Sequence, residues 1–443
     1  MAEQTGTEQV VENRPTPQIW NQYMREVYWN RKGPEALGTV SIEDIEEKAK
    51  ERLKDYPGAF MYAGGNAGTG STYRANLKAF QRYRIIPRML VNTTVRNLEA
   101  TILGVRYPSP LLIAPIGVQG IFSAEGELAP ARAARNLKIP FVLSTVSSRS
   151  MDVVARENGS GHRWYQLYWP KSQDVTVSLL KRAKANGFSA VVITLDTMAL
   201  GWRPHDIDIS YMPLIHGVGM ECGRSDPVFM AKFGLQPTLD HHPEFPYNPL
   251  ARDKLISEGD SKTLEESKLG NAWLAEVCSG QFHSWDDLKF IRDNWDGPIV
   301  LKGIQRRSDA EKALESGING IIVSNHGGRQ VDGAIPSLYA LAEIMDSDKI
   351  KQAQKAGKLT VLFDSGIRTG SDIIKAMALG AQGVLLGRPF LYGAILAGQA
   401  GVEQVIRHTM ADLDTTLGLS GYASLDEIHG IGEELVKKID FET

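Results

Sequence analysis

The sequence is poor in cysteine, in long apolar runs and in net charge. Its 443 residues include only Cys222 and Cys278, too few for a disulfide framework and without metal-ligand spacing, so we expect a reducing compartment and no metal site. No run approaches the roughly 18 consecutive apolar residues of a membrane span, and the N-terminal residues lack the apolar core of a signal peptide. A net charge of -3 gives no bias toward nucleic acid. We therefore predict a cytoplasmic protein that binds neither membranes nor nucleic acid.

Short apolar runs alternate with helical patterns from Pro110 onward, which predicts a parallel α/β fold. Eight runs read as buried strands: Leu111–Pro115, Phe141–Thr145, Trp164–Tyr168, Ala190–Leu195, Ile299–Lys302, Gly320–Val323, Leu359–Phe363 and Gly383–Leu386. The helices expected after them include Ala124–Leu137, Asp174–Ala185, Ser308–Ser316, Ser371–Leu379 and Tyr392–Thr409. Eight such repeats predict a closed (β/α)8 TIM barrel. The alternative is an open doubly wound sheet, but Ala114-Pro-Ile-Gly117 replaces the glycine-rich dinucleotide turn after the first strand.

Two segments lie outside this repeat and define the expected domain organisation. Residues 1–40 are polar and interrupted by proline, and we interpret them as a flexible N-terminal arm ahead of a helical extension that begins near Ser41. Residues 41–443 then form one barrel domain. Residues 212–284 interrupt the alternation after the fourth strand with proline, histidine and dense charge. Such an insertion is an active-site lid in one interpretation, and a disordered spacer or a subunit contact in the other.

The apolar run Gly320–Val323 stops at a packed polar segment, Ser324-Asn-His-Gly-Gly-Arg-Gln330. Catalytic groups of barrels come from the carboxyl ends of the strands, so His326 and Arg329 are expected to place a base beside an anion clamp. A buried histidine held by its neighbours is the alternative.

The seventh and eighth strands lead into Phe363-Asp-Ser-Gly-Ile-Arg-Thr-Gly370 and Leu386-Gly-Arg-Pro389. Glycines, backbone N–H groups and two arginines at this place in a barrel favour a phosphorylated ligand. Turn geometry and surface ion pairs are the alternative explanation.

With these motifs the chain resembles the FMN-dependent α-hydroxy-acid oxidizing family, which includes glycolate oxidase, lactate oxidase, lactate monooxygenase and flavocytochrome b2. The similarity runs from about Ser41 to Asp426. Besides the 324–330 segment it rests on Tyr62, Gln166-Leu-Tyr168, Thr194-Leu-Asp196, Val300-Leu-Lys302-Gly303, Asp364-Ser-Gly-Ile-Arg368 and Gly387-Arg-Pro389. The resemblance implies bound FMN, a small L-2-hydroxy acid as substrate, dioxygen as a further reactant, and a homotetramer or larger homo-oligomer.

The resemblance also implies roles for individual residues. The catalytic group would consist of the general base His326, the carboxylate Asp196 that orients it, Tyr168 at the substrate hydroxyl, and Lys302 beside the reduced flavin. The substrate carboxylate would be bound by Tyr62, Arg203 and Arg329. The residues expected at the cofactor are Gly117, Ser144, Gln166, Thr194, Lys302, Ser324, Asp364, Gly366, Arg368, Gly387 and Arg388.

Several features bear on the electron acceptor and on the products of the reaction. The segment before Ser41 is too short for a haem module, so dioxygen is the expected acceptor. Gly117 stands where the family's oxidases usually carry alanine and where lactate monooxygenase carries glycine, and Gly201-Trp-Arg-Pro204 and the long insertion also resemble that member. We therefore expect conversion of L-lactate to acetate, carbon dioxide and water. An oxidase that releases 2-keto acid and hydrogen peroxide is the alternative, and a non-catalytic FMN-binding protein is a remote one.

Overall fold

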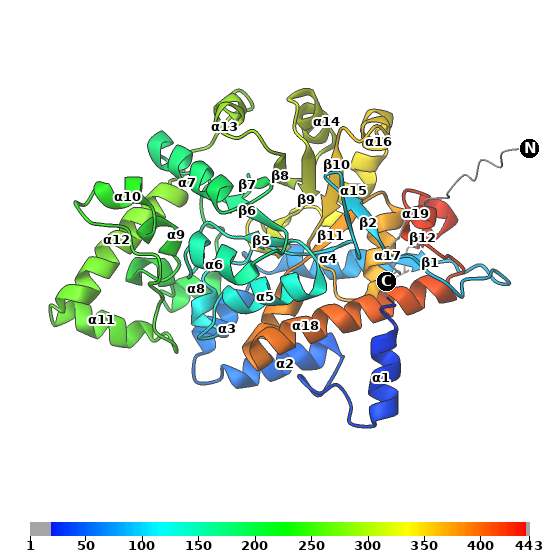
Figure 1. The fold of residues 1–443 in the computed structure, drawn as a ribbon, viewed down its shortest axis with the longest axis horizontal. Helices are drawn as coiled ribbons and strands as arrows, with labels where there is room; N and C mark the ends of the chain where they lie inside the picture. The colour runs from blue at the N-terminus through cyan, green and yellow to red at the C-terminus, as the bar shows by residue number, and fades with distance from the viewer. Residues whose placement is uncertain (1–18, 440–443) are drawn as a thin grey trace, which may run out of the picture.

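The computed structural model describes residues 19–439, which form a closed barrel of eight parallel strands surrounded by helices (Figure 1). The strands follow one another around the barrel in chain order, and the last pairs with the first. They are β4 (Leu111–Ile113), β5 (Phe141–Leu143), β6 (Arg163–Leu167), β7 (Val191–Thr194), β8 (Ile299–Ile304), β9 (Gly320–Val323), β10 (Thr360–Phe363) and β11 (Gly383–Leu386). The predicted (β/α)8 TIM barrel is confirmed.

The barrel strands are short apolar runs because both of their faces are covered. Every residue of β9, β10 and β11 is buried, as expected for parallel strands between a packed interior and a layer of helices. Strand β4 ends two residues before its predicted end, since Pro115 has no N–H to donate. Strand β5 also ends two residues early, since the Thr145 hydroxyl donates to the Gln166 carbonyl oxygen in place of a ladder hydrogen bond. Strand β8 continues to Ile304, two residues beyond the prediction.

The outer layer contains the predicted helices and several others. These are α5 (Leu128–Leu137), α6 (Met151–Asn158), α7 (Gln173–Ala185), α13 (Leu288–Asn294), α14 (Arg307–Glu315), α15 (Ser337–Met345), α16 (Asp348–Lys355), α17 (Gly370–Ala378) and α18 (Arg388–Leu419). Helix α5 begins later than predicted because the buried Glu127 carboxylate accepts the backbone N–H groups of Gln119 and Ser148. Helix α18 is longer than predicted and has a kink at Ala397 and Gly398.

Part of the predicted N-terminal arm is packed against the barrel. Helix α1 (Gln22–Asn30), which the sequence did not predict, follows Trp20, whose side chain is buried. The backbone N–H of Asn21 donates to Asp414 of α18 at 2.8 Å. The expectation of a flexible arm is therefore wrong for residues 19–40, and its residues 1–18 lie outside the described residues. The chain continues through α2 (Ile42–Arg52), which Ser41 caps, α3 (Pro57–Gly64) and α4 (Ser71–Arg82).

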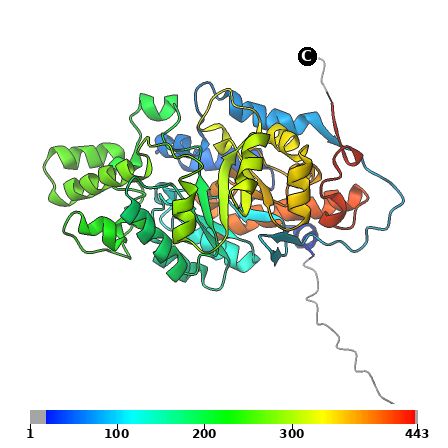
Figure 2. The same ribbon diagram turned by 90° about the horizontal axis from the view of Figure 1, so that it is seen from above.

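The insertion after β7 is a helical layer beside the barrel (Figures 1 and 2, green). After α8 (Pro204–Asp208) it consists of η2 (Pro213–His216), α9 (Glu221–Arg224), α10 (Pro227–Ala231), α11 (Pro249–Ser257) and α12 (Ser261–Val277). A buried ionic network joins these pieces, with His241 between Glu221 and Glu266 and with Arg252 paired to Glu266. The interpretation as a disordered spacer is therefore wrong.

The amino ends of the strands are closed by a hairpin of β2 (Ala100–Ile102) and β3 (Val105–Tyr107). Ile102 lies against the first residue of β11, and Tyr107 joins the side chains that fill the barrel interior. A second small sheet pairs β1 (Tyr83–Ile85) with β12 (Val436–Lys438). Across residues 19–439, no helix has the length and apolar character needed to cross a membrane. Because the β2–β3 hairpin closes the amino ends of the strands, polar groups gather at the opposite, carboxyl ends of the strands.

Candidate active site

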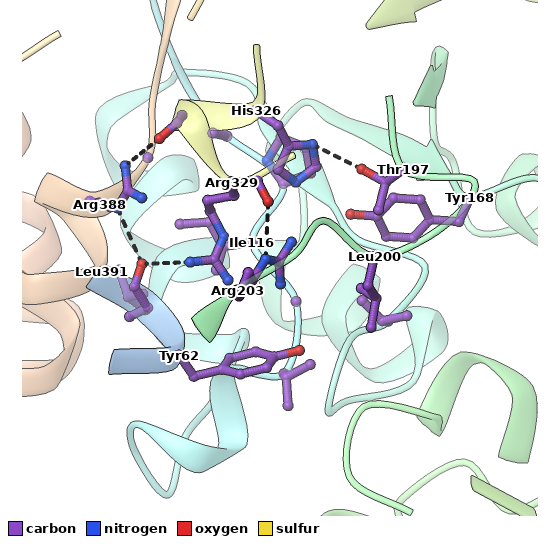
Figure 3. A pocket seen from close by; sticks show the side chains of 18 of the residues that line it. Tyr62, Ile116, Tyr168, Thr197, Leu200, Arg203, His326, Arg329, Arg388 and Leu391 are labelled. Carbon is purple, nitrogen blue, oxygen red and sulfur yellow. Dashed lines mark hydrogen bonds between the residues drawn. The ribbon is translucent and has the colours of Figure 1, made fainter. Parts of the chain in front are cut away.

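A cavity of about 190 Å³ lies at the carboxyl ends of the strands and brings together side chains from distant parts of the chain (Figure 3). Twelve of the residues predicted from the sequence line it: Tyr62, Gly117, Tyr168, Arg203, Lys302, His326, Arg329, Asp364, Gly366, Arg368, Gly387 and Arg388. Five others do not line it, namely Ser144, Gln166, Thr194, Asp196 and Ser324. Three of these five, Ser144, Asp196 and Ser324, contact lining residues directly.

His326 and Asp196 form a short hydrogen bond at the edge of the cavity. The Nδ1 atom of His326 lies 2.7 Å from Oδ1 of Asp196 and 3.1 Å from the Thr197 hydroxyl. Burial lowers the pKa of His326, although Asp196 opposes the shift. Burial would raise the pKa of Asp196, but His326 and Lys302 outweigh it and lower that pKa. The pair is therefore a neutral imidazole beside a carboxylate, in which Nδ1–H donates and Nε2 remains to accept a proton.

The backbone around His326 explains why glycines follow it. His326 itself has a φ of 59°, and Gly327 and Gly328 have φ values of 66° and 76°. A Cβ on Gly328 would lie 2.6 Å from the backbone nitrogen of Tyr73 in α4, so only glycine fits there. The Ser324 hydroxyl accepts the His326 N–H at 3.0 Å. The turn after β9 thus holds the His326 backbone in a left-handed conformation that few non-glycine residues adopt.

Three arginines crowd one side of the cavity. Arg203 donates to the Arg329 carbonyl oxygen at 3.1 Å, and Arg329 and Arg388 donate to the Gly65 carbonyl oxygen at 2.7 and 3.1 Å. Burial and the two neighbouring cations lower the pKa of Arg329 to about 9. Within residues 19–439, none of the three forms an ion pair with a carboxylate. The nearby Asp206 carboxylate interacts with Arg203 and Arg329 without touching them. Three guanidinium groups with no carboxylate in contact, held inside a cavity, are suited to binding an anion.

Lys302 is a buried cation between two carboxylates. Its Nζ lies 3.1 Å from the Ser324 hydroxyl, 3.5 Å from Asp364 and 3.8 Å from Asp196. Burial would lower the pKa of Lys302, but Asp364 and Asp196 outweigh burial and raise it. The ammonium group therefore stays charged, and it faces the cavity that His326 also lines.

Two of the predicted polar groups that do not line the cavity, Gln166 and Thr194, bond to each other. Gln166 donates to the Thr194 hydroxyl at 3.0 Å, and the backbone N–H of Thr145 donates to Gln166. Gly117 does line the cavity. A Cβ there would be 2.5 Å from a methyl of Val146 and 2.7 Å from the Val146 carbonyl oxygen. The close approach of the two loops therefore requires glycine at position 117.

Several lining residues were not predicted. Thr197 contacts both members of the His326–Asp196 pair, and its place directly after Asp196 was the only signal for it. The other unpredicted apolar lining comes largely from loops and from the insertion: Ile116, Leu200, Met212, Leu214, Leu274, Val277 and Cys278. No motif marks these residues, because apolar side chains in an irregular segment have no periodic pattern to read.

Comparison with known proteins places this architecture in a family. The chain matches the FMN-dependent dehydrogenase family over residues 49–436. It is 41% identical over 409 residues, 91% of this chain and 93% of the relative, to the FMN-dependent alpha-hydroxy acid dehydrogenase qulF of Penicillium citrinum. It is 36% identical to the L-lactate oxidase of Lysinibacillus sphaericus, covering 88% of this chain and 92% of that one. A crystal structure of mandelate oxidase superimposes with a TM-score of 0.71 at 32% identity, over 90% of this chain and 99% of that chain.

The chain therefore belongs to the FMN-dependent dehydrogenase family. It is an oxidoreductase that uses FMN to oxidise a 2-hydroxy acid.

The residues of the cavity fit this cofactor. Nη2 of Arg368 is buried without a hydrogen-bond partner, so a donor is available for a phosphate oxygen. The long helix α18 begins at Arg388 directly after Gly387, and helix N-termini bind phosphate through their free N–H groups. Gly366, with a φ of 111°, lies in the same lining. The donors for an anionic phosphate and the cation Lys302 thus lie along one continuous cavity.

Proposed function

We propose that the enzyme oxidises an L-2-hydroxy acid by proton abstraction at His326, and that L-lactate is such a substrate. The observation that carries this proposal is the neutral His326 imidazole, which shares one cavity with the unpaired guanidinium groups of Arg203 and Arg329. In the view of Figure 3 these guanidinium groups lie between the rings of His326 and Tyr62. A carboxylate bound by the arginines would bring the neighbouring carbon and its hydroxyl toward Nε2 of His326.

The side chains around the substrate then have separate tasks. Arg203 and Arg329 bind the carboxylate, and the buried Tyr62 hydroxyl completes its hydrogen bonds. His326 takes a proton from the substrate, and Asp196 stabilises the imidazolium that forms. Burial raises the pKa of Tyr168, so its hydroxyl stays protonated and donates to the substrate oxygen.

The cofactor-binding residues follow the same division. When bound, FMN supplies a two-electron acceptor. Lys302 would place its charge beside the flavin ring, and we assign the polar contacts of the ring to Ser144, Gln166, Thr194 and Ser324, with Gly117 beside it. We assign the ribityl-phosphate end to Asp364, Gly366, Arg368, Gly387 and Arg388.

We further propose that the 2-keto acid is retained until dioxygen has reacted, so that the overall reaction is L-lactate plus dioxygen to acetate, carbon dioxide and water. Retention is supported by the insertion, because η2 and α12 contribute Leu214, Leu274 and Val277 to the wall of the cavity. Gly117 gives weaker support than expected, because the contact with Val146 already requires glycine at that position.

The test of this proposal is to incubate the yellow holoenzyme with L-lactate in air and to measure products against the oxygen consumed. We expect one acetate for each dioxygen and no free hydrogen peroxide. Pyruvate and peroxide in equal amounts would contradict retention and identify an oxidase. Failure of L-lactate to bleach the flavin without oxygen would contradict the choice of substrate.

The pH dependence of the reaction should follow His326. Its pKa is lowered by burial, so the neutral, proton-accepting form persists below the ordinary histidine pKa of about 6.5. We expect kcat/KM to stay constant from neutral pH to about 6.5 and to fall only as the pH drops through the lowered pKa. Asp196→Asn removes the charge that opposes the shift, and should move this acid limb to still lower pH. An acid limb above 6.5 in the wild-type enzyme would contradict a neutral buried His326.

We also propose that the chain assembles as a homotetramer or a larger homo-oligomer. The projecting segment 86–95, the blue loop at the right of Figure 2, exposes Met89, Leu90 and Val95. Exposed apolar residues gathered on one projection suit a surface that a second copy covers. Light scattering on the purified holoenzyme should give the mass of at least four chains, and a single-chain mass would contradict this assembly.

A further inference from the structure

The cavity has an apolar wall that takes no part in proton transfer or in binding the substrate carboxylate. Five of its residues come from the insertion: Met212, Leu214, Leu274, Val277 and Cys278. Val146 joins them from the barrel loop after β5. We call these six residues the insertion wall. Burial raises the pKa of Cys278, the one member with an ionisable group, so its thiol stays neutral. The insertion wall therefore presents no charge to the cavity.

The insertion wall is rigid because its two helical pieces touch through their backbones. A Cβ on Gly270 of α12 would overlap the carbonyl oxygen of Leu214 in η2. A Cβ on Gly217, which has a φ of 83°, would lie 2.9 Å from the Glu266 carbonyl oxygen in α12. Such contact leaves no space through which η2 could slide past α12.

The insertion wall is also fixed to the barrel. The Glu276 carboxylate in the last turn of α12 accepts the Ser172 backbone N–H at 2.9 Å and the Ser172 hydroxyl at 2.7 Å, just before α7. Two residues beyond Cys278, the N–H of Gly280 donates to the Met198 carbonyl oxygen at 2.9 Å. On the η2 side, a Cβ on Gly219 would lie 2.9 Å from Val118. The turn that carries Leu274, Val277 and Cys278 is thus held in place by contacts within the protein.

We propose that the insertion wall is the subsite for the substrate side chain and that it selects aliphatic substituents longer than a methyl group. This inference rests on the proposed oxidation of L-2-hydroxy acids. A preformed apolar surface gains affinity with each methylene that it removes from water, about 4-fold for each. A second carboxylate would be buried against it without a partner and is therefore rejected. L-Lactate is then the smallest member of the substrate series.

The test compares kcat/KM for L-lactate, L-2-hydroxybutyrate, L-2-hydroxyisocaproate and L-malate with the holoenzyme. We expect the value to rise along the first three, with L-2-hydroxyisocaproate at least 10-fold above L-lactate, and L-malate to be the poorest. The flavin absorbance should show the same order in the dissociation constants of pyruvate and 2-ketoisocaproate. A value that is constant or falls with chain length would overturn the proposal.

Variants locate the preference in the insertion wall. Leu274→Phe fills the subsite and should lower the ratio of kcat/KM for L-2-hydroxyisocaproate over L-lactate by 10-fold or more. Leu264→Phe on the same helix is the control, because Leu264 is exposed and lies outside the cavity, and it should leave the ratio unchanged. Equal ratios in the two variants would overturn the assignment. Met212→Phe, directly before η2, repeats the test from the other side of the insertion wall if Leu274→Phe loses FMN.

Failure of this inference is distinguishable from failure of the proposed function. If L-lactate bleaches the flavin without oxygen and the longer acids do not, the subsite is wrong and the oxidation stands. If none of the four acids bleaches the flavin, both the proposed oxidation and the subsite are overturned.

Discussion

Replacing His326 with glutamine should leave a yellow, FMN-containing protein that a 2-hydroxy acid no longer bleaches without oxygen. Glutamine keeps much of the size and polarity of the imidazole but cannot take the substrate proton at neutral pH. Loss of a positioned general base costs about 10²–10⁴-fold in rate, and we expect the upper part of that range because Asp196 also loses its partner. Stopped-flow absorbance of the oxidised flavin after anaerobic mixing with L-lactate measures the effect.

The control for this variant is His242→Gln. His242 is exposed in the insertion, and within residues 19–439 the only hydrogen bond of its ring is to the neighbouring Pro243 carbonyl oxygen. It should bleach at the wild-type rate with the same FMN content. Bleaching of His326→Gln at a rate within 10-fold of the wild type would remove His326 from the role of base, while the fold and the cofactor assignment would stand.

Replacing Arg329 with lysine should lower kcat/KM by about 100-fold, mainly through a higher KM. Lysine keeps the charge but loses the planar pair of donors that a carboxylate binds. It also cannot reproduce both contacts of the guanidinium with the Ala63 and Gly65 carbonyl oxygens. A charged hydrogen bond contributes about 1.5–3 kcal/mol, and the upper half of that range corresponds to the expected loss. Steady-state oxygen uptake over a range of L-lactate concentrations measures both constants.

Arg156→Lys is the matched control, because Arg156 forms an exposed ion pair with Asp240 and does not line the cavity. Exposed pairs contribute little, so its kinetic constants should equal those of the wild type. FMN content should be normal in both proteins. A wild-type KM in Arg329→Lys would show that the substrate carboxylate binds elsewhere, and Arg203 would be the next residue to test.

The barrel was predictable because its signal is local. Gly320–Val323 and Gly383–Leu386 match the observed strands at both ends, since each is a short apolar run between residues that break strands. Once eight strands point the same way, their carboxyl ends meet, so the sequence alone predicts that His326, Lys302 and Arg388 lie near one another. All three line the same cavity. The roles assigned to these residues remain predictions.

The sequence could not show how distant segments pack. Helix α1 was missed because none of its residues is buried and its place depends on contacts with α18, almost 400 positions away. Gly117 illustrates a second limit. The sequence showed a glycine beside the expected flavin, but only the structure showed that Val146 approaches too closely for any side chain there.

The sequence by itself determined the strand order, the polar strand ends and the family motifs, because periodic burial and short motifs depend only on residues close together in sequence. Tertiary structure alone decided the protonation of His326, the crowding of three arginines and the insertion wall. Each of these depends on distances between residues far apart in sequence. Electrostatic energies and packing are set by such distances, which no local pattern specifies.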